Sequence, residues 1–259
     1  MARPSVLALP VLLFTSSCVI AIGDGAREQA REERHATFAL DGAATVRVEG
    51  RNGSLRVVQG GGGEIDCEAL LTAWADTRLE AEDELAAMAV VAERSGSVLR
   101  IHVDIPPGLH RWAAAMNLRV PAGIALDLDT SNGRIVVEDP FPTVRADTSN
   151  AAVEVRCAGR AELATSNGSV ALSGPVADFD IHTSNASVTV DLIGDWSGRG
   201  EVRTSNGAIA LSCSGRLRAA ATASTSNGRI RGVENLRREA GGFLVLRTSN
   251  ADITVSAPD

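Results

Sequence analysis

The chain has 259 residues, of which 44% are hydrophobic and 22% are charged, as in globular proteins with a substantial core. Aromatic residues make up only 3%, none of them Tyr, and the formal net charge is −7. Nucleic-acid and carbohydrate sites usually rely on aromatic side chains, so the composition argues against both. The negative charge argues further against nucleic acid as a partner.

Residues 1–18 have the pattern of a signal peptide. Arg3 precedes an apolar run at residues 6–14 that is too short to span a membrane. Small residues then lead into Cys18, which resembles a bacterial lipoprotein signal, with Thr15 where Leu is usual. This resemblance makes Cys18 the lipid attachment site and the membrane a partner through that lipid. An ordinary secretory signal cut nearby, for example after Ala21, is the alternative.

Residues 19–35 carry charges of both signs and predict a solvated tether. Residues 36–115 predict an N-terminal β cap. In this segment Val46, Val48, Leu55 and Val57 flank an Asn-Gly corner at residues 52–53, which indicates a degenerate version of the repeat found further on.

The stretch from Ile65 to Ala115 interrupts the repeat. It predicts strands at residues 65–74, 90–93 and 98–105, and a short helix, capped by Asp76, containing Leu79, Leu85 and Met88. Repeat arrays need terminal units that cover their ends, so we interpret this segment as a cap. A ligand pocket around Trp74 and Trp112 is the alternative interpretation.

Residues 116–259 contain the sequence Thr-Ser-Asn-Gly/Ala seven times, with 17 to 23 residues between successive Asn residues. Such a fixed period indicates a repeat architecture. The corner residues are Thr130 and Asn132, Thr148 and Asn150, Thr165 and Asn167, Thr183 and Asn185, Thr204 and Asn206, Thr225 and Asn227, and Thr248 and Asn250.

Apolar residues recur four and two positions before each Thr and three and five positions after each Asn. This period of two predicts a strand on either side of a sharp corner. About 20 residues are too few for a propeller blade, so we predict an all-β fold in which each repeat is one coil of a β-solenoid, similar to a single-stranded β-helix, with one short helix in the cap.

Parity places Thr and Asn inward and Ser outward, so the corner residues should form structural ladders that satisfy turn amides. Asn and Gly tolerate a left-handed backbone, but Ala in three of the seven corners argues against a positive φ at every one. The alternative is a functional Thr/Asn surface, such as a ligand-binding or ice-binding face.

Three further expectations follow from stacking the repeats. Cys157 and Cys213 fall in one column three coils apart, about 14 Å, so they should not form a disulfide with each other. Asp129 and Asp147 fall in neighbouring coils, which could serve a glycosidase or bind a cation, but a solvated pair is the preferred interpretation. The last coil should leave an edge able to pair with another molecule.

The sequence contains no catalytic, metal-binding or cofactor-binding motif, and its four His residues share no ligand spacing. We therefore expect a non-enzymatic protein without metal or cofactor.

The run at residues 118–126, which enters the corner at Thr130 and continues to Ile135, resembles the bacterial putative adhesin family of β-strand-repeat envelope proteins. The resemblance covers roughly residues 36–259. It implies an all-β solenoid-like domain in the cell envelope. Together with the N-terminal signal, this leads us to expect an outer-membrane-anchored lipoprotein, periplasmic or surface-facing, or otherwise a secreted protein, that binds a protein or glycan surface ligand. A periplasmic module for envelope-stress sensing or scaffolding is the first alternative, and a polysaccharide-acting enzyme is the second. The family supplies no catalytic residues to carry over.

Overall fold

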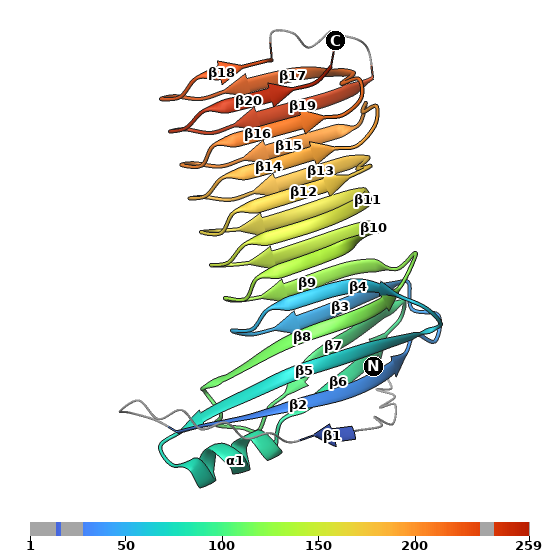
Figure 1. The fold of residues 1–259 in the computed structure, drawn as a ribbon, viewed down its shortest axis with the longest axis vertical. Coiled ribbons are helices and arrows are strands. Elements are labelled where there is room, and N and C mark those ends of the chain that lie inside the picture. Colours follow the sequence, from blue (N-terminus) through green and yellow to red (C-terminus); the bar gives the residue numbers. More distant parts are fainter. Residues whose placement is uncertain (1–13, 17–27, 234–240, 259) are drawn as a thin grey trace, which may run out of the picture. The chain divides into compact units, whose positions relative to one another are not determined.

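The computed structural model describes residues 14–16, 28–233 and 241–258, which are mostly β-structure with one short helix (Figure 1). The chain divides into two compact units, Met1–Gly133 and Arg134–Asp259. Within the described residues, no helix is long and apolar enough to cross a membrane. Apart from β1 (Phe14–Ser16), the predicted signal peptide, with Cys18 as its lipidation candidate, lies outside the described residues.

The first unit contains two series of hydrogen-bonded strands. In one series β1, β2 (Glu28–Ala39), β5 (Glu64–Ala75) and β8 (Trp112–Pro121) are antiparallel neighbours in that order, and β4 (Leu55–Gly60) runs parallel to β8. In the other, β6 (Ala89–Ser95) is antiparallel to β7 (Val98–Asp104), while β7, β3 (Thr45–Gly50) and β9 (Ala125–Thr130) are parallel neighbours. The predicted strands at residues 65–74, 90–93 and 98–105 are therefore confirmed.

The corner predicted around residues 52–53, with a strand on either side, is present. Strands β3 and β4 flank this corner, and Val46, Val48, Leu55 and Val57 are all fully buried. Gly50 occupies the position opposite Thr130 of β9, as expected for the residue that replaces the repeat Thr.

Residues 28–35 do not belong to a solvated tether, which corrects the prediction for 19–35. They form the first two thirds of β2, which pairs with β5 over its full length. Ala30 is fully buried and Arg34 is only 7% exposed. The prediction was wrong because the many charged residues of this segment outweighed its period-2 pattern. In that pattern the inward-facing residues are Ala30, Arg34, Ala36 and Phe38. Residues 19–27 lie outside the described part of the chain.

Helix α1 (Arg78–Ala86) is present as predicted, but Thr77 caps it and not Asp76. The Thr77 hydroxyl accepts from the Glu80 amide at 3.2 Å, and the Glu80 carboxylate accepts from the Thr77 amide at 3.2 Å, which forms a capping box. Leu85 is buried, Met88 follows the helix, and Leu79 is 69% exposed. At the other end, the Arg34 guanidinium donates to the carbonyl oxygens of Leu85 (2.8 Å) and Met88, and so takes the place of a C-terminal basic cap.

The second unit consists of parallel strands arranged on either side of the repeated corners (Figure 1). The strands are β10 (Ile135–Thr148), β11 (Val153–Thr165), β12 (Val170–Gly174), β13 (Asp178–His182), β14 (Val188–Leu192), β15 (Arg199–Arg203), β16 (Ile209–Cys213), β17 (Ala219–Ser224), β18 (Ile230–Arg231), β19 (Gly242–Arg247) and β20 (Ile253–Ser256). Their registers align the predicted apolar columns. For example, Val153, Val170 and Val188 lie directly beside one another after successive corners.

The last repeat does not lie at the end of the stack. Strand β19 pairs with β15 on one side and β17 on the other, and β20 lies between β16 and β18 in the same way. The repeat with corner Thr248 is thus inserted between those with corners Thr204 and Thr225. The prediction that the last coil forms an exposed edge is therefore wrong. The outermost described repeat is that of β17 and β18, whose positions in the four predicted apolar columns are Ala221, Ala223, Ile230 and Gly232.

Cys157 and Cys213 are buried and free, which confirms the prediction that they are not bonded to each other. Cys67 of β5 is also buried and free. Burial raises the pKa of all three thiols, that of Cys67 to about 12.

Candidate functional site

The corner threonines connect neighbouring repeats through hydrogen bonds from their side chains. In the second unit five of these hydroxyls each donate to the carbonyl oxygen of the Gly or Ala that ends the adjacent corner. These bonds join Thr165 to Ala151 (3.2 Å), Thr183 to Gly168 (3.2 Å), Thr204 to Ala186 (3.3 Å), Thr248 to Gly207 (2.9 Å) and Thr225 to Ala251 (2.9 Å); in the first unit Thr130 bonds Gly53 (3.2 Å). All corner threonines except Thr225 are buried, including Thr148.

The corner asparagines face solvent, which corrects the prediction that they point inward. Ser and Asn are two consecutive outward residues, so the register shift falls between them and the inward alternation resumes at Gly or Ala. The asparagine side chains bond to one another: Nδ2 of one repeat donates to Oδ1 of its neighbour. These bonds join Asn167 to Asn150 (2.9 Å), Asn185 to Asn167 (2.8 Å), Asn206 to Asn185 (2.9 Å), Asn250 to Asn206 (2.7 Å) and Asn227 to Asn250 (2.7 Å); in the first unit Asn132 bonds Asn52 (2.6 Å).

Glycine at the corner is explained by close approach and not by a left-handed backbone. None of the seven repeated corners has a residue with positive φ, although Asn52 of the degenerate corner has a φ of 57°. A Cβ added at Gly168 would overlap the carbonyl oxygen of Ala151, and one at Gly207 would overlap that of Ala186. Hence the last residue of these corners must be glycine, because the carbonyl oxygen of the neighbouring alanine occupies the space that a Cβ would need.

Glycine and alanine alternate in the order in which the corners are stacked. Along the second unit the residues in this slot are Ala151, Gly168, Ala186, Gly207, Ala251 and Gly228. The inserted last repeat carries the alanine that separates two glycine corners. The inserted order therefore places Gly228 against an alanine corner.

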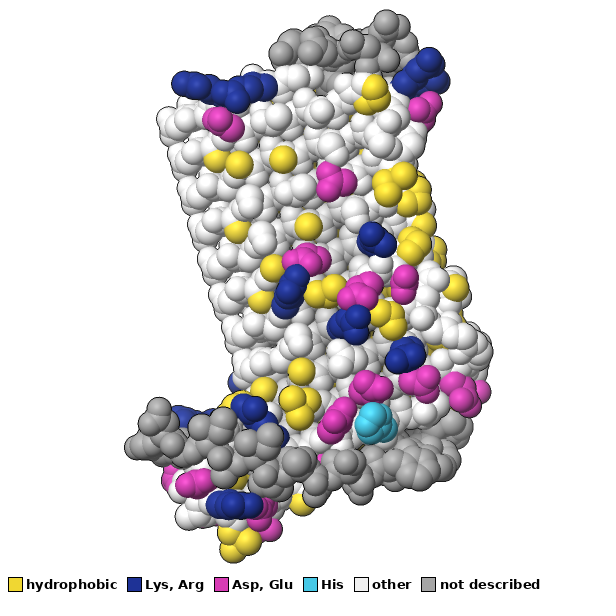
Figure 2. Space-filling view, in the orientation of Figure 1, with side chains coloured by type: hydrophobic (Ala, Val, Ile, Leu, Met, Phe, Trp, Pro, Cys, Tyr) yellow, Lys and Arg dark blue, Asp and Glu magenta, His cyan; other side chains and the backbone are white. Residues whose placement is uncertain are grey.

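The corner edge also presents serine hydroxyls to solvent. Ser149, Ser166, Ser205, Ser226 and Ser249 are exposed, and Ser184 is partly exposed. Neighbouring parallel strands lie about 4.8 Å apart, so this edge carries a regular row of hydroxyls beside the row of amides. Elsewhere, on the face drawn in Figure 2, described acidic, basic and apolar side chains are interspersed and form no large patch of one kind.

The two aspartates considered for catalysis have different surroundings. Asp129 lies on β9 of the first unit, opposite Glu49 of β3. Asp147 lies on β10 of the second unit, opposite Ala164, where it lines a shallow hollow of about 230 Å³ with Glu162 and His182. Within the described residues, no group of three or more His, Cys, Asp or Glu side chains is placed to hold a metal ion.

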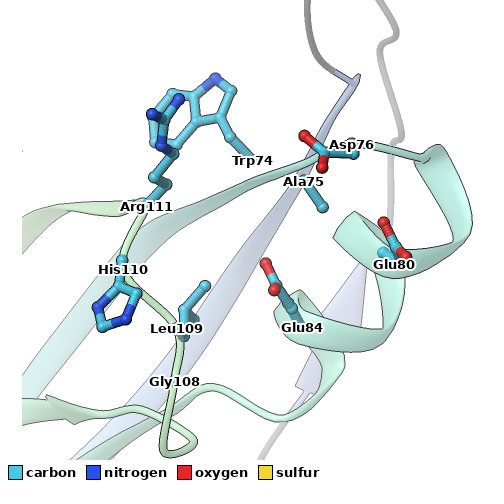
Figure 3. Close-up of a pocket in the computed structure, with 9 residues that line it drawn as sticks. All are labelled: Trp74, Ala75, Asp76, Glu80, Glu84, Gly108, Leu109, His110 and Arg111. Atoms are coloured by element: carbon cyan, nitrogen blue, oxygen red, sulfur yellow. The ribbon is translucent and has the colours of Figure 1, made fainter.

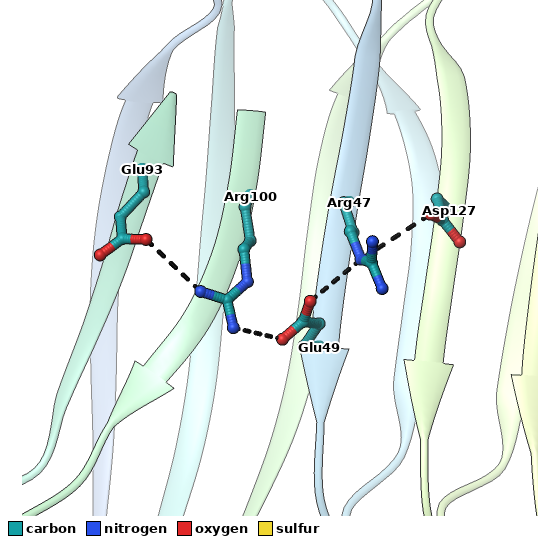
Figure 4. Close-up of polar contacts among 5 residues, drawn as sticks. All are labelled: Arg47, Glu49, Glu93, Arg100 and Asp127. Atoms are coloured by element: carbon teal, nitrogen blue, oxygen red, sulfur yellow. Dashed lines mark hydrogen bonds and ion pairs between the residues drawn. The ribbon is translucent and has the colours of Figure 1, made fainter. Parts of the chain in front are cut away.

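A network of five charged residues crosses four strands of the first unit (Figure 4). Arg100 bonds Glu49 (2.6 Å) and Glu93 (3.4 Å), and Arg47 pairs with Glu49 (3.0 Å) and Asp127 (3.7 Å). The hydrogen bond from Arg100 is the main cause that holds the pKa of the Glu49 carboxyl below its usual range. Each charge faces an opposite charge, so the network ties β6, β7, β3 and β9 together.

The pocket suggested by Trp74 and Trp112 is present in the first unit as two neighbouring cavities. The first, of about 250 Å³, lies between α1 and residues 108–111 and is drawn in Figure 3. The second, of about 390 Å³, is lined by both tryptophans with Asn52, His110 and Arg111. Trp74, His110 and Arg111 line both. The Trp74 amide donates to the Arg111 carbonyl at 3.1 Å, which fixes the two residues beside each other.

The tryptophans of this pocket were predicted from the sequence, but the acidic side chains that line it were not. Asp76, Glu80 and Glu84 line the first cavity opposite Trp74 and Arg111 (Figure 3). Glu80 and Glu84 are four residues apart on α1 and therefore lie on one face of the helix, so this spacing was the available signal, whereas Asp76 precedes the N-cap. Nothing in the sequence indicated that residues 108–111 would complete the pocket.

No family model matches the sequence, and no curated protein matches it. Among solved structures, the chain is similar to a putative cell adhesion protein from Clostridium sporogenes, with 9% identity, 88% of this chain and 100% of that chain covered, and a TM-score of 0.40. It is also similar to a putative adhesin from Bacteroides fragilis (10% identity, 87% and 97% covered, TM-score 0.40) and a putative lipid binding protein from Parabacteroides distasonis (11% identity, 92% and 98% covered, TM-score 0.41). These neighbours share little sequence with the chain and assign no role to its residues.

Proposed function

We propose that the chain is an exported β-solenoid that acts as a non-enzymatic adhesion or binding module of the bacterial cell envelope. The solenoid is supported by the parallel pairing of equivalent strands in the second unit, which repeats from one corner to the next. A surface built in this way presents the same groups many times at a fixed spacing.

The observation that carries the binding role is the exposed corner edge with its rows of Ser hydroxyls and Asn amides. The ladder bonds between asparagines hold this edge in one arrangement, so little conformational entropy is lost when a ligand contacts it. Many weak contacts at a fixed spacing suit an extended protein or glycan on another surface, where they add through multivalency.

The membrane anchor in this proposal is a lipid on Cys18. It is supported by the apolar run at residues 6–14 and the small residues before Cys18 in the sequence. A lipid-modified N-terminus would hold the module at a membrane. This requires more than one acyl chain, because a single chain gives only marginal binding.

The test begins with protease shaving of intact cells that make the native protein or a Cys18→Ala variant, followed by detergent partitioning. Surface exposure and lipid partitioning of the native protein, lost in the variant, are expected for an anchored adhesin. Protection of the native protein until the outer membrane is opened would rule out adhesion and favour periplasmic sensing or scaffolding.

The corner edge is tested by replacing Ser166 and Ser205 with Ala, which removes hydroxyls and leaves the Asn ladder in place. The matched control replaces Ser169 and Ser187 with Ala. Both serines are exposed, and each lies two positions after a corner Asn. We expect the first pair to weaken attachment of cells to surfaces coated with mucin, serum protein or cell-wall polysaccharide, and the control pair to leave it unchanged. Equal attachment by both variants on every coating would contradict a binding role for this edge.

A further inference from the structure

Charge is segregated along the second unit. Residues 134–198 carry four Arg and nine acidic residues, whereas the described residues of 199–258 carry seven Arg and only Glu201 and Asp252 as acids. The second stretch forms the three outermost described repeats, those with corners Thr204, Thr248 and Thr225. The outer end of this unit is therefore basic, although the chain as a whole carries a net negative charge.

Two of these arginines lie on one side of the corner edge. Arg203 and Arg247 each directly precede a corner Thr, are exposed, and lie opposite each other on the neighbouring strands β15 and β19. Arg203 pairs with Glu201 at 2.5 Å, whereas Arg247 has no ion pair among the described residues. Like charges directly opposite in a sheet repel each other. Since neighbouring strands are about 4.8 Å apart, both guanidinium groups can reach one anion, which would relieve that repulsion.

Two more arginines lie on the other side of the same edge. Arg229 and Arg231 follow the outermost corner, two and four positions after Asn227, and both are exposed. The Asp252 carboxylate accepts the backbone N–H of Arg229 at 2.7 Å. Neither guanidinium has an ion pair in the part of the chain that the structure describes. The outer end of the corner edge therefore has arginines on both sides.

The inner repeats of the second unit have no arginine at the positions of Arg203 and Arg229. The residues directly before Thr and two positions after Asn are Asp147, Ala164, His182, Ala152, Ser169 and Ser187. The ladder of asparagines nevertheless continues from the inner to the outer repeats. The corner edge thus offers hydroxyl and amide groups along its length and positive charge at one end only.

We propose that the ligand of the corner edge is an acidic polysaccharide, whose carboxylate groups bind the arginines at the outer end and whose hydroxyl groups contact the Ser and Asn side chains. This inference rests on the binding role proposed above for that edge. Arginine fits such a ligand because its planar guanidinium binds carboxylate through two parallel hydrogen bonds. Single-stranded nucleic acid, the other extended polyanion, binds by stacking on aromatic side chains, and the Thr-Ser-Asn-Gly/Ala corners contain none.

The test compares polygalacturonate with its methyl ester, which share one backbone and differ in whether the carboxyl groups are charged. Binding of each to the full chain is measured by calorimetry at low and at high salt, with single-stranded DNA as a polyanion of another class. We expect the acid to bind at least about tenfold more tightly than the ester, and its binding to weaken as the salt concentration rises. Equal affinity for acid and ester, or a preference for DNA, would overturn the proposal.

A pair of double variants locates the charge selectivity. Arg203→Gln with Arg247→Gln should reduce the affinity for the acid about tenfold, to that for the ester. The control, Arg199→Gln with Arg216→Gln, removes the same charge from exposed positions at the strand ends away from the corner, and should keep the selectivity. Thermal scans check that both variants remain folded, as expected for exposed side chains. Equal losses in the two variants would overturn the assignment to the corner edge.

These results are separable from those for the proposed function. If Ser166→Ala with Ser205→Ala weakens cell attachment but the purified chain binds acid and ester equally, the edge is a binding surface and the acidic ligand is wrong. If the chain selects the acid through Arg203 and Arg247 but cells that make it attach to no coating, the acidic ligand is supported and adhesion is wrong.

Discussion

Gly228 lies against the carbonyl oxygen of Ala251, a residue of the following repeat in the chain, and not against Gly207 of the preceding one. The Thr225 hydroxyl donates to the same Ala251 oxygen at 2.9 Å, and Asn227 bonds Asn250 at 2.7 Å. Ala251 in turn ends a corner whose Thr248 bonds Gly207. The fit of glycine against alanine corners is thus linked to the order in which the repeats are stacked.

The alternation predicts opposite sensitivity at neighbouring corners. Gly168→Ala would place a methyl group in the space of the Ala151 carbonyl and should cost about 2–3 kcal/mol of unfolding free energy. Ala186→Gly adds no atoms and should cost about 0.5–1 kcal/mol through backbone entropy. Urea denaturation measures both, and equal losses would contradict the role assigned to the glycines.

The inserted order can be tested by crosslinking. Asn206 and Asn250 are direct neighbours, bonded at 2.7 Å, whereas Asn206 and Asn227 are separated by the inserted repeat. A disulfide needs Cα atoms within about 7 Å. The pair Asn206→Cys and Asn250→Cys should therefore oxidise to a disulfide that peptide mass mapping detects. The pair Asn206→Cys and Asn227→Cys should stay reduced, and the reverse result would restore the sequential order of the repeats.

Arg34 should be among the most sensitive charged residues of the first unit. It is buried, and its guanidinium supplies donors to two carbonyl oxygens at the end of α1 and to Glu32 at 2.7 Å. Arg34→Met should lower the unfolding free energy by about 2–4 kcal/mol, because the buried carbonyls and carboxylate lose their donor. Arg78→Met, at an exposed pair with Glu82, should leave the unfolding free energy nearly unchanged in the same thermal or urea scans.

The buried thiols should be unreactive in the folded chain. Burial raises the pKa of Cys67 to about 12 and raises those of Cys157 and Cys213, so the thiolate that reacts is scarce at pH 8. Iodoacetamide should leave these three unmodified in the native protein and label all three after unfolding, as counted by mass spectrometry. Rapid native labelling of Cys67 would contradict its burial. A fourth label would show that Cys18 is retained with a free thiol, whereas its absence agrees both with lipidation and with cleavage after Ala21.

Glu49 should link the stability of the first unit to pH. Its pKa is lowered in the folded state, chiefly by the hydrogen bond from Arg100, so its contribution is complete above the pKa of the unfolded chain. That contribution is lost as the pH falls through the lower, folded pKa. Comparing the melting temperatures of native protein and Glu49→Gln from pH 7 to pH 3 should show a gap at neutral pH that closes in acid. A gap that widens in acid would reverse the sign.

The repeat unit could be predicted from the sequence because burial within one repeat follows a local period of two. Thr165 and Val170 are inward as predicted, and their positions need only the chain around one corner. Which repeats are adjacent is a non-local property, so the apolar columns could not show that β19 lies between β15 and β17. The available signal was the chain order of the last corner residues, Gly207, Gly228 and Ala251, which puts two glycine corners in succession.

Other differences have local causes. The corner asparagines were expected inside because the shift of alternation was placed after Asn, whereas it falls between Ser and Asn. Arg34 was assigned to a tether because a buried arginine breaks the usual rule that charge is exposed. At the pocket, Glu84 could be placed on a helix face, but the other wall is formed by residues 108–111, which are distant in sequence.

Because β19 and β20 are inserted between earlier strands, some strands are synthesised before the strands with which they pair. A polypeptide emerges from its N-terminus onward, so the segment of β17 and β18 is delivered before the segment that must lie beneath it. Until residues 242–256 are synthesised, β15 and β16 lack the strands that pair with them on one side. Over the same period β17 and β18 have no pairing partner among the described strands. A chain released before residue 242 would therefore lose two repeats and not one, which makes the last segment the step that completes the fold.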